Sequence, residues 1–234
     1  MAGMSLASSF ITAAMGIGGG VMLLAVMASL FPPMALIPVH GVIQLGSNFF
    51  RALVMLGHAH RRPALAFGAG SVAGVVLGGR FAVQLEPAWV QLGIGAFVLW
   101  SVFLTPPKWL SKAAAPTGLI SSFLTMFFGA TGPFVANYVK SLQLPRQEHV
   151  ATHAVLMTVQ HALKSVTFGV LGFAFGPWAG FIAMMIAMGF LGTLLGKRVL
   201  MRMGDRHFRR ALDLMLLVLS LRLLWQGASA LLGT

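Results

Sequence analysis

The sequence predicts an all-α polytopic membrane protein built from two repeats, and three observations support this prediction. Hydrophobic residues make up 58% of the 234 residues and charged residues only 9%, against about a quarter charged in a soluble domain. The mean hydropathy is +0.88, and the apolar stretches are long enough to cross as helices rather than as the alternating strands of a porin. Two of these stretches also carry the same glycine-rich interruption.

Eight apolar segments can be drawn, at 5–31, 35–57, 64–85, 87–105, 116–142, 150–175, 177–201 and 208–232. The first is interrupted by Gly16-Ile-Gly-Gly-Gly20 and the fifth by Gly129-Ala-Thr-Gly-Pro133. Glycine costs about 1 kcal/mol in a helix interior and proline about 3 kcal/mol. We therefore expect each of these two segments to form two half-helices joined by an unwound turn.

A shift of the chain by 113 positions reveals an internal duplication. It places Gly16 on Gly129, and it also aligns three pairs of rarer residues: Pro32 with Pro145, His40 with His153, and Arg51 with Lys164. A proline, a histidine and a cation in one register are hard to obtain by chance. The sequence therefore predicts one repeat over 1–113 and a second over 114–234, the usual construction of secondary transporters.

The basic residues predict how the two repeats face. They gather around the loops after the second, fourth, fifth and seventh segments, as Arg61, Arg62, Lys108, Lys112, Lys140, Arg146, Lys197, Arg198, Arg202, Arg206, Arg209 and Arg210. If all eight segments crossed, these loops would lie on both sides and the positive-inside rule would fail for one half. If the first and fifth segments are re-entrant hairpins, the strongly basic loops share one side, with Arg80 beside Glu86 as a weak exception. Each repeat then has three crossings and one hairpin, so the repeats are inverted and both termini lie outside the cytoplasm.

Polar side chains lie on one face each of the second and sixth segments. At about 100° per residue, those of the second segment fall within an arc of about 100°. They are His40, Gln44, Ser47, Asn48 and Arg51, and the sixth segment matches them with His153, Gln160, His161 and Lys164. Each stripe has a histidine at one end and a cation roughly 16 Å further along. Such groups either bind a ligand or form interhelical hydrogen bonds, with the cations reaching the membrane surface.

The glycine breaks favour the ligand interpretation. A half-helix N-terminus presents main-chain N–H groups and about half a positive charge, which suits an anion. Carboxylates for a metal cation, Na⁺ or a proton relay are scarce, since the acidic residues number four, and no cofactor is expected. The predicted substrate site comprises Gly18, Gly19, Gly20, His40, Gln44, Asn48, Arg51, Thr131, Gly132, His153, Gln160, His161 and Lys164.

The motifs Gly16–Gly20, Phe31-Pro-Pro33, Ile37–Asn48 and Arg51 resemble the first repeat of the TauE/SafE family, the sulfite exporter family of permeases. Gly129–Pro133 with His161-Ala-Leu-Lys164 resembles its second repeat. The likeness covers essentially the whole chain and implies a carrier of sulfite, sulfonates or related small organic anions. Pro133 stands where the first break has Gly20, which removes one N–H donor.

The sequence thus predicts a secondary transporter of a small sulfur-containing anion in the cell (inner) membrane, working by alternating access, with export the favoured direction. A passive anion channel lined by the same residues is the alternative. A membrane metalloenzyme is poorly supported, because the histidines have no acidic partner and His153 and His161 are eight residues apart, too far for one metal on a regular helix. The expected partners are the anion and the lipid bilayer, a homodimer being one compatible assembly. Nucleic acid is not expected despite a net charge of +12, since the cations follow topology.

Overall fold

The computed structural model describes residues 1–28, 30–81, 92, 96, 99 and 112–232, and every regular element in them is helical. This confirms the all-α prediction, whereas the expected segment at 87–105 lies almost wholly outside the described residues. The elements are α1 (Ala2–Met15), α2 (Gly19–Ala28), α3 (Pro33–Val54), η1 (Leu56–His58), α4 (Arg62–Phe81), α6 (Ala114–Phe128), α7 (Gly132–Ser141), α8 (Arg146–Val170), η3 (Gly176–Trp178), α9 (Ala179–Arg202) and α10 (Asp205–Leu232).

Both predicted helix breaks are present and share one geometry. At the end of α1, Gly16 is left-handed (φ 83°) and its N–H donates to Thr12 O at 3.0 Å. At the end of α6, Gly129 is left-handed (φ 73°) and donates to Thr125 O at the same distance. Glycine adopts this conformation without the steric cost of a Cβ, which is why it ends helices in this way. The glycine pattern therefore predicted the position and the cause of both breaks.

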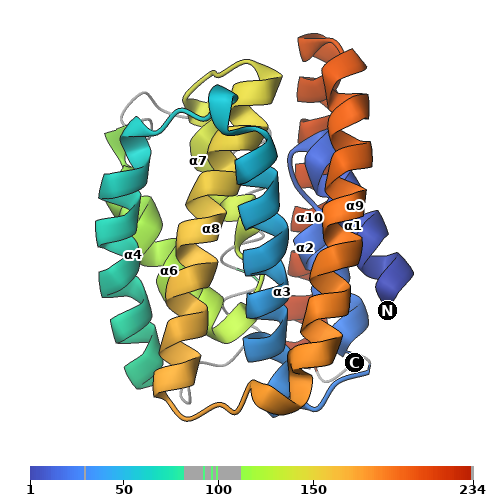
Figure 1. Ribbon diagram of the computed structural model, residues 1–234. Coiled ribbons are helices and arrows are strands. Elements are labelled where there is room, and N and C mark those ends of the chain that lie inside the picture. Colours follow the sequence, from blue (N-terminus) through green and yellow to red (C-terminus); the bar gives the residue numbers. More distant parts are fainter. Residues whose placement is uncertain (29, 82–91, 93–95, 97–98, 100–111, 233–234) are drawn as a thin grey trace.

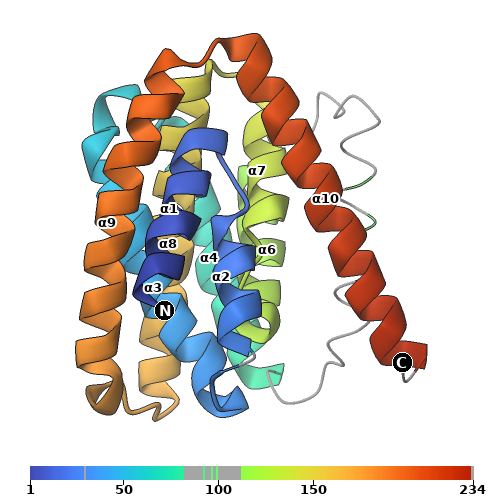
Figure 2. The same ribbon diagram turned by 90° about the vertical axis from the view of Figure 1, so that its right-hand side faces the viewer.

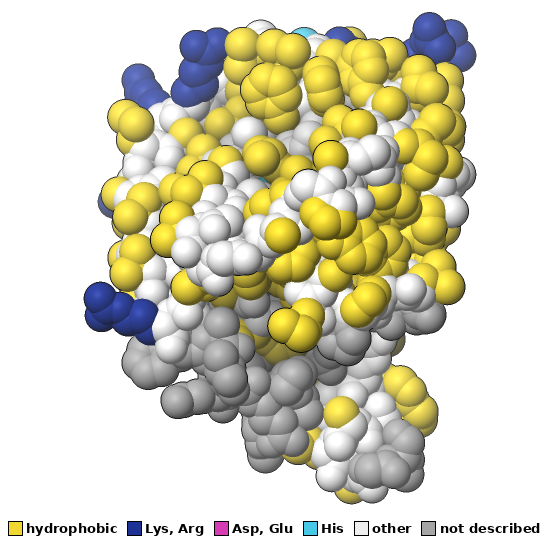
Figure 3. All heavy atoms as spheres, turned by 60° about the horizontal axis from the view of Figure 1, so that its bottom comes forward, with side chains coloured by type: hydrophobic (Ala, Val, Ile, Leu, Met, Phe, Trp, Pro, Cys, Tyr) yellow, Lys and Arg dark blue, Asp and Glu magenta, His cyan; other side chains and the backbone are white. Residues whose placement is uncertain are grey.

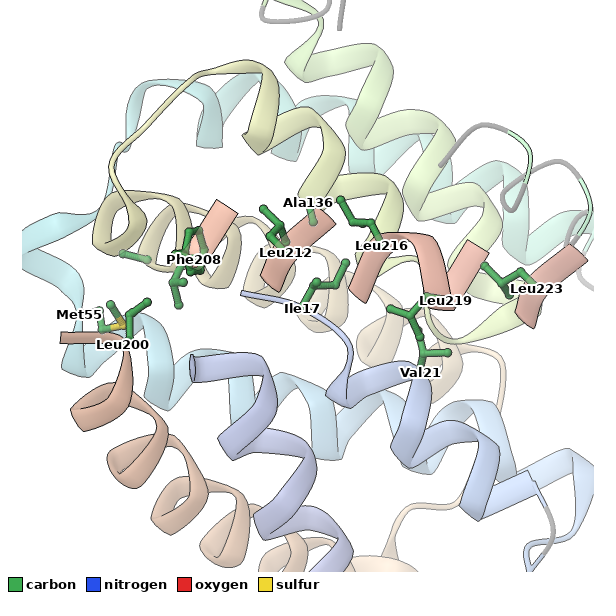
Figure 4. Packing of buried hydrophobic residues seen from close by; sticks show 12 residues of the cluster. Ile17, Val21, Met55, Ala136, Leu200, Phe208, Leu212, Leu216, Leu219 and Leu223 are labelled. Atoms are coloured by element: carbon green, nitrogen blue, oxygen red, sulfur yellow. The ribbon is translucent and has the colours of Figure 1, made fainter. Parts of the chain in front are cut away.

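The two broken helices lie on either side of a central pair formed by α3 and α8 (Figure 1). In Figures 1 and 2, α3 runs upward and α8 downward, and the α1–α2 hairpin opens towards the lower end whereas the α6–α7 hairpin opens towards the upper end. α10 crosses behind both hairpins. Its leucines at 212, 216, 219 and 223 pack against Ile17 and Val21 of the first hairpin and Ala136 of the second (Figure 4).

The outer helices pack against the hairpin of the opposite half of the chain. α9 packs on α1, where a Cβ placed on Gly192 would lie 2.1 Å from the main-chain oxygen of Leu6. α4 packs on α6, where a Cβ on Gly74 would lie 2.3 Å from the oxygen of Leu119. Leu6 and Leu119 are 113 positions apart, so the same contact occurs twice. Only glycine allows these helices to approach so closely, as is typical of packing in membranes.

Replacing Gly192 by alanine is expected to destabilise the protein by about 2–3 kcal/mol, because the new methyl group would meet backbone that cannot rotate away. Gly180→Ala on the same helix is the control, since no atom lies within 4 Å of the added Cβ. Thermal unfolding of the purified variants in detergent measures the difference. Equal midpoints for the two variants would show that α1 and α9 are not packed as described.

The described exterior is largely apolar. Large hydrophobic side chains point outward, including Leu65 at 87% and Val170 at 82% exposure, and Figure 3 shows hydrophobic side chains across the described near face with Lys and Arg at its edges. By length and composition, two of the described helical stretches could cross a membrane, Gly176–Arg202 and Asp205–Leu232. The expected six crossings are therefore not all evident in the described helices.

Candidate functional site

The polar stripes of α3 and α8 face the interior of the helix bundle. The predicted polar residues of both stripes are buried, and the most exposed of them, Gln44, retains 7% exposure. Two fully buried cations are among them, Arg51 at 1% and Lys164 at 0%. Burial of this many polar groups is costly unless they are hydrogen-bonded or bind a ligand.

A small cavity lies between the two helix breaks and the two stripes. Its volume of about 30 Å³ is room for about one or two water molecules. It is lined by Thr12, Ile17, Gly18, Gly20, Val21, His40, Gln44, Asn48, Gly129, Ala130, Gly132, Pro133, His153, Met157 and His161. Segments far apart in the sequence thus converge on one centre, as the duplication led us to expect.

Most of the predicted site residues line this cavity, namely Gly18, Gly20, His40, Gln44, Asn48, Gly132, His153 and His161. The other predicted residues, Gly19, Arg51, Thr131, Gln160 and Lys164, are not among the lining residues. The sequence analysis missed Met157, although the repeat could have indicated it, since it stands 113 positions after Gln44. Thr12 also lines the cavity and was not predicted, although the same shift pairs it with Thr125.

His40 of α3 and His153 of α8 stand at equivalent positions, and each contacts the start of a second half-helix, α2 or α7. His40 Nε2 lies 3.0 Å from Gly20 O, and His153 Nε2 lies 3.3 Å from Gly132 O. A carbonyl oxygen only accepts, so Nε2 carries the hydrogen in each ring. Each histidine of the central pair therefore fixes the first turn of a half-helix beside the cavity, where main-chain N–H groups lack intrahelical partners.

Three predicted anion-binding residues form hydrogen bonds within the protein. Gly19 donates its N–H to Thr12 Oγ1 at 3.1 Å, which closes the first hairpin. In the second hairpin, Gln160 Nε2 donates to Thr131 Oγ1 at 2.8 Å. Ser121 Oγ donates to Gln160 Oε1 at 2.6 Å, and Thr131 Oγ1 donates to Ser121 O at 3.3 Å. The Thr131 hydroxyl thus holds the second break in place.

The buried cations stand behind the cavity wall. Arg51 Nη1 donates to Asn48 Oδ1 at 2.9 Å and Nη2 donates to Ser47 Oγ at 3.1 Å. Lys164 Nζ donates to Gly129 O, at the tip of the second break, at 3.2 Å. Neither cation forms an ion pair with a carboxylate of the described residues, where the ion pairs are Lys140–Asp213 and Arg146–Asp205. Two basic side chains are thus buried beside the cavity without an acidic partner among the described residues.

Comparison with protein families identifies the family of the chain. The family model described as "Sulfite exporter TauE/SafE" matches residues 1–223 of the 234. The chain belongs to the TauE/SafE family. No curated protein and no solved structure matches the chain.

Membership of the TauE/SafE family makes the chain a membrane-integral transporter of the sulfite-exporter type and not an enzyme. The resemblance seen in the sequence is thereby confirmed. Its two quoted glycine motifs are the two breaks of this TauE/SafE chain, and its polar motif runs along the buried face of α3. The motifs that carry the likeness therefore surround the cavity.

Proposed function

We propose that the chain is a secondary transporter of a small sulfur-containing anion, organic or inorganic, such as sulfite or a sulfonate, with export the favoured direction. The observation that carries this proposal is the pair of buried cations, Arg51 and Lys164, beside a cavity between two helix breaks and without a described carboxylate partner. A buried charge in a medium of low dielectric constant requires compensation. A bound anion supplies it.

Different groups of the site contribute differently to binding. The cations attract the anion through the cavity wall, Arg51 from behind Asn48 and Lys164 from behind Gly129, since charges interact over several ångströms in a low-dielectric interior. Gly18, Gly20 and Gly132 bring the positive ends of α2 and α7 to the cavity. The small cavity volume favours an anion with few heavy atoms.

We further propose that the chain is a multi-pass protein of the cell (inner) membrane with two inverted repeats, 1–113 and 114–234, which exchange conformations by alternating access. The equivalent contacts of Gly192 with α1 and Gly74 with α6 support this, as do the opposite directions of α3 and α8. The loops after α3, α7 and α9 contain the basic tracts and share the upper end in Figure 1. The positive-inside rule then makes this end cytoplasmic.

Single cysteines at the basic end of the molecule are expected to react with a labelling reagent only from the cytoplasmic side, and those at the uncharged end only from the opposite side. The chain has no native cysteine, so His60→Cys and His207→Cys, exposed at the basic end, need no altered background. Both should react with a membrane-impermeant maleimide only when the cytoplasmic side is opened. Met34→Cys and Ala174→Cys, exposed at the uncharged end, should react in intact spheroplasts. Reaction of His60→Cys and His207→Cys from opposite sides would rule out the inverted arrangement.

A binding screen tests the function itself. Purified protein is titrated with sulfite, short sulfonates and carboxylates, and the anions that bind are then used in proteoliposomes. A carrier should show saturable counterflow of a bound anion, whereas the channel alternative, which family membership does not favour, would give unitary currents. Failure of every anion to bind would overturn the proposal.

A further inference from the structure

The hydrogen bonds on the buried face of α3 form a chain with a fixed direction. It begins at Arg51, whose guanidinium can only donate. Since Arg51 Nη1 donates to Asn48 Oδ1 at 2.9 Å, the amide oxygen of Asn48 must face Arg51. Its Nδ2 group consequently faces away from Arg51, towards Gln44.

The next link fixes the amide of Gln44. Asn48 Nδ2 donates to Gln44 O at 2.8 Å and lies 3.4 Å from Gln44 Oε1. With Oε1 accepting from Asn48, Gln44 Nε2 is the amide atom left to donate at the first break, where a Cβ placed on Gly20 would lie 3.3 Å from Nε2 and 3.5 Å from Oε1. Gln44 and Gly20 both line the cavity. The wall formed by α3 therefore presents an N–H donor. An acceptor there would require the Gln44 amide to turn over, which would bring its Nε2 to face the donor Asn48 Nδ2.

The far end of the chain is anchored in a second helix. Arg51 Nη2 donates to Ser47 Oγ at 3.1 Å, and Ser47 Oγ lies 2.8 Å from Ser9 Oγ of α1. All of these side chains are at most 7% exposed. Arg51 is thus held at both of its terminal nitrogens, and its orientation does not depend on a ligand.

The second repeat lacks this chain. Met157 stands at the position equivalent to Gln44, His161 at that of Asn48, and Lys164 donates to Gly129 O rather than to its own helix. Gln44 and Met157 both line the cavity. The cavity therefore has a directed donor on the α3 wall and a thioether at the equivalent place on α8.

We propose that Gln44 is a specificity-determining donor to the transported anion, and that Arg51, acting through Asn48, is the positioning residue that keeps Gln44 Nε2 turned towards the cavity. This inference rests on the proposed function. A fixed donor stabilises an oxygen that only accepts, whereas an O–H group placed there would leave two donors facing each other, which is costly when buried. The site would therefore select fully deprotonated headgroups, such as a sulfonate, over monoprotonated headgroups of equal charge.

Two small probes of the same charge and similar shape distinguish a fully deprotonated headgroup from a monoprotonated one. At mildly acidic pH, methanesulfonate is a monoanion with three acceptor oxygens, and methylphosphonate is a monoanion with one P–OH group. The readout is the ratio of their two dissociation constants, measured on one preparation of full-length protein in detergent. Overall charge effects and the folded fraction cancel in this ratio. His40 also lines the cavity, and its Nδ1 atom has no hydrogen-bond partner among the described residues, so it is a second acceptor for the P–OH group. The absolute ratio therefore does not depend on Gln44 alone, and the test is the change in the ratio between variants.

Gln44→Glu replaces the donor by an acceptor of the same size. It should weaken binding of both probes, and it should shift the ratio towards methylphosphonate by about tenfold or more, because the introduced carboxylate accepts from P–OH and repels a bare sulfonate oxygen. Gln147→Glu is the matched control, since it makes the same chemical change at the basic end of α8, outside the lining residues. Its ratio should equal that of the unaltered protein.

Arg51 is tested by rescue. Arg51→Gln replaces the donor-only group by an amide that can turn over, and it should shift the ratio in the same direction by about threefold. Arg51→Lys keeps a donor-only group and should restore the original ratio. An unchanged ratio in Gln44→Glu, with both probes still bound by the unaltered protein, would overturn the inference and leave the proposed function intact. If the unaltered protein binds neither probe nor any other anion, the proposed function itself is wrong.

Discussion

Arg51→Met and Lys164→Met are each expected to weaken binding of the transported anion on the order of 100-fold. Each change removes a buried positive charge that no described carboxylate neutralises, and loss of one partner of a buried charge interaction has effects of this size. Methionine keeps most of the apolar stem of both side chains, so the packing around α3 and α8 is largely preserved. Titration of the purified variants with the anions bound by the unaltered protein gives the measurement.

Lys197→Met is the control for this pair. Lys197 is also a partly buried cation, but it donates to Val54 O at 2.7 Å at the end of α3 and does not line the cavity. Its replacement should lower thermal stability and leave the affinity for the anion unchanged. Lys164→Met should also lower stability, because Gly129 O loses its donor. Unaltered affinity in both the Arg51 and Lys164 variants would remove the basis of the proposed site.

The sequence predicts the two helix breaks and the polar face of α3, because both follow from the spacing of residues along the chain. Glycines at 16 and 129 specify left-handed helix ends, and helical spacing places His40, Gln44 and Asn48 on one face of α3. Both features depend on residues close together in the chain. The internal repeat then pairs the two halves without any three-dimensional information.

The partners of individual side chains are not predictable in this way. Thr131 was expected to bind an anion, yet its hydroxyl meets Gln160, 29 residues further along the chain. The sequence placed Lys164 in the site but did not indicate that its Nζ donates to Gly129 O, 35 residues earlier. Such contacts depend on how far each hairpin penetrates between α3 and α8, and the spacing of residues along one helix carries no information on that depth.

Hydropathy misleads for a related reason. α3 and α8 occupy the centre of the bundle, where their polar faces meet, and neither is among the described helices long and apolar enough to cross a membrane, whereas the peripheral α9 and α10 are. The helices most important for the site are thus the ones that composition alone identifies least clearly as membrane-spanning. That they cross the membrane is part of the proposed topology, which their packing inside the bundle supports.

Gly19→Ala is expected to prevent the α1–α2 hairpin from closing. A Cβ at this position would lie 1.7 Å from Ser8 O and 2.4 Å from Thr12 Oγ1. Because the obstacle is main chain, it can be relieved only by opening the hairpin, and we expect destabilisation of more than about 3 kcal/mol. The measurement is the yield of monodisperse protein in detergent and its thermal unfolding midpoint.

Gly132→Ala provides the comparison at the equivalent position of the second repeat. There the nearest atom to the added Cβ is Met157 Cε at 4.0 Å, so the unfolding midpoint should stay close to that of the unaltered protein. The difference arises because the main chain of Ser8 and the hydroxyl of Thr12 lie directly against Gly19 in the first hairpin. The second hairpin is held by the side chains of Thr131, Gln160 and Ser121. A comparable loss of stability in both variants would mean that the two breaks close alike, contrary to these contacts.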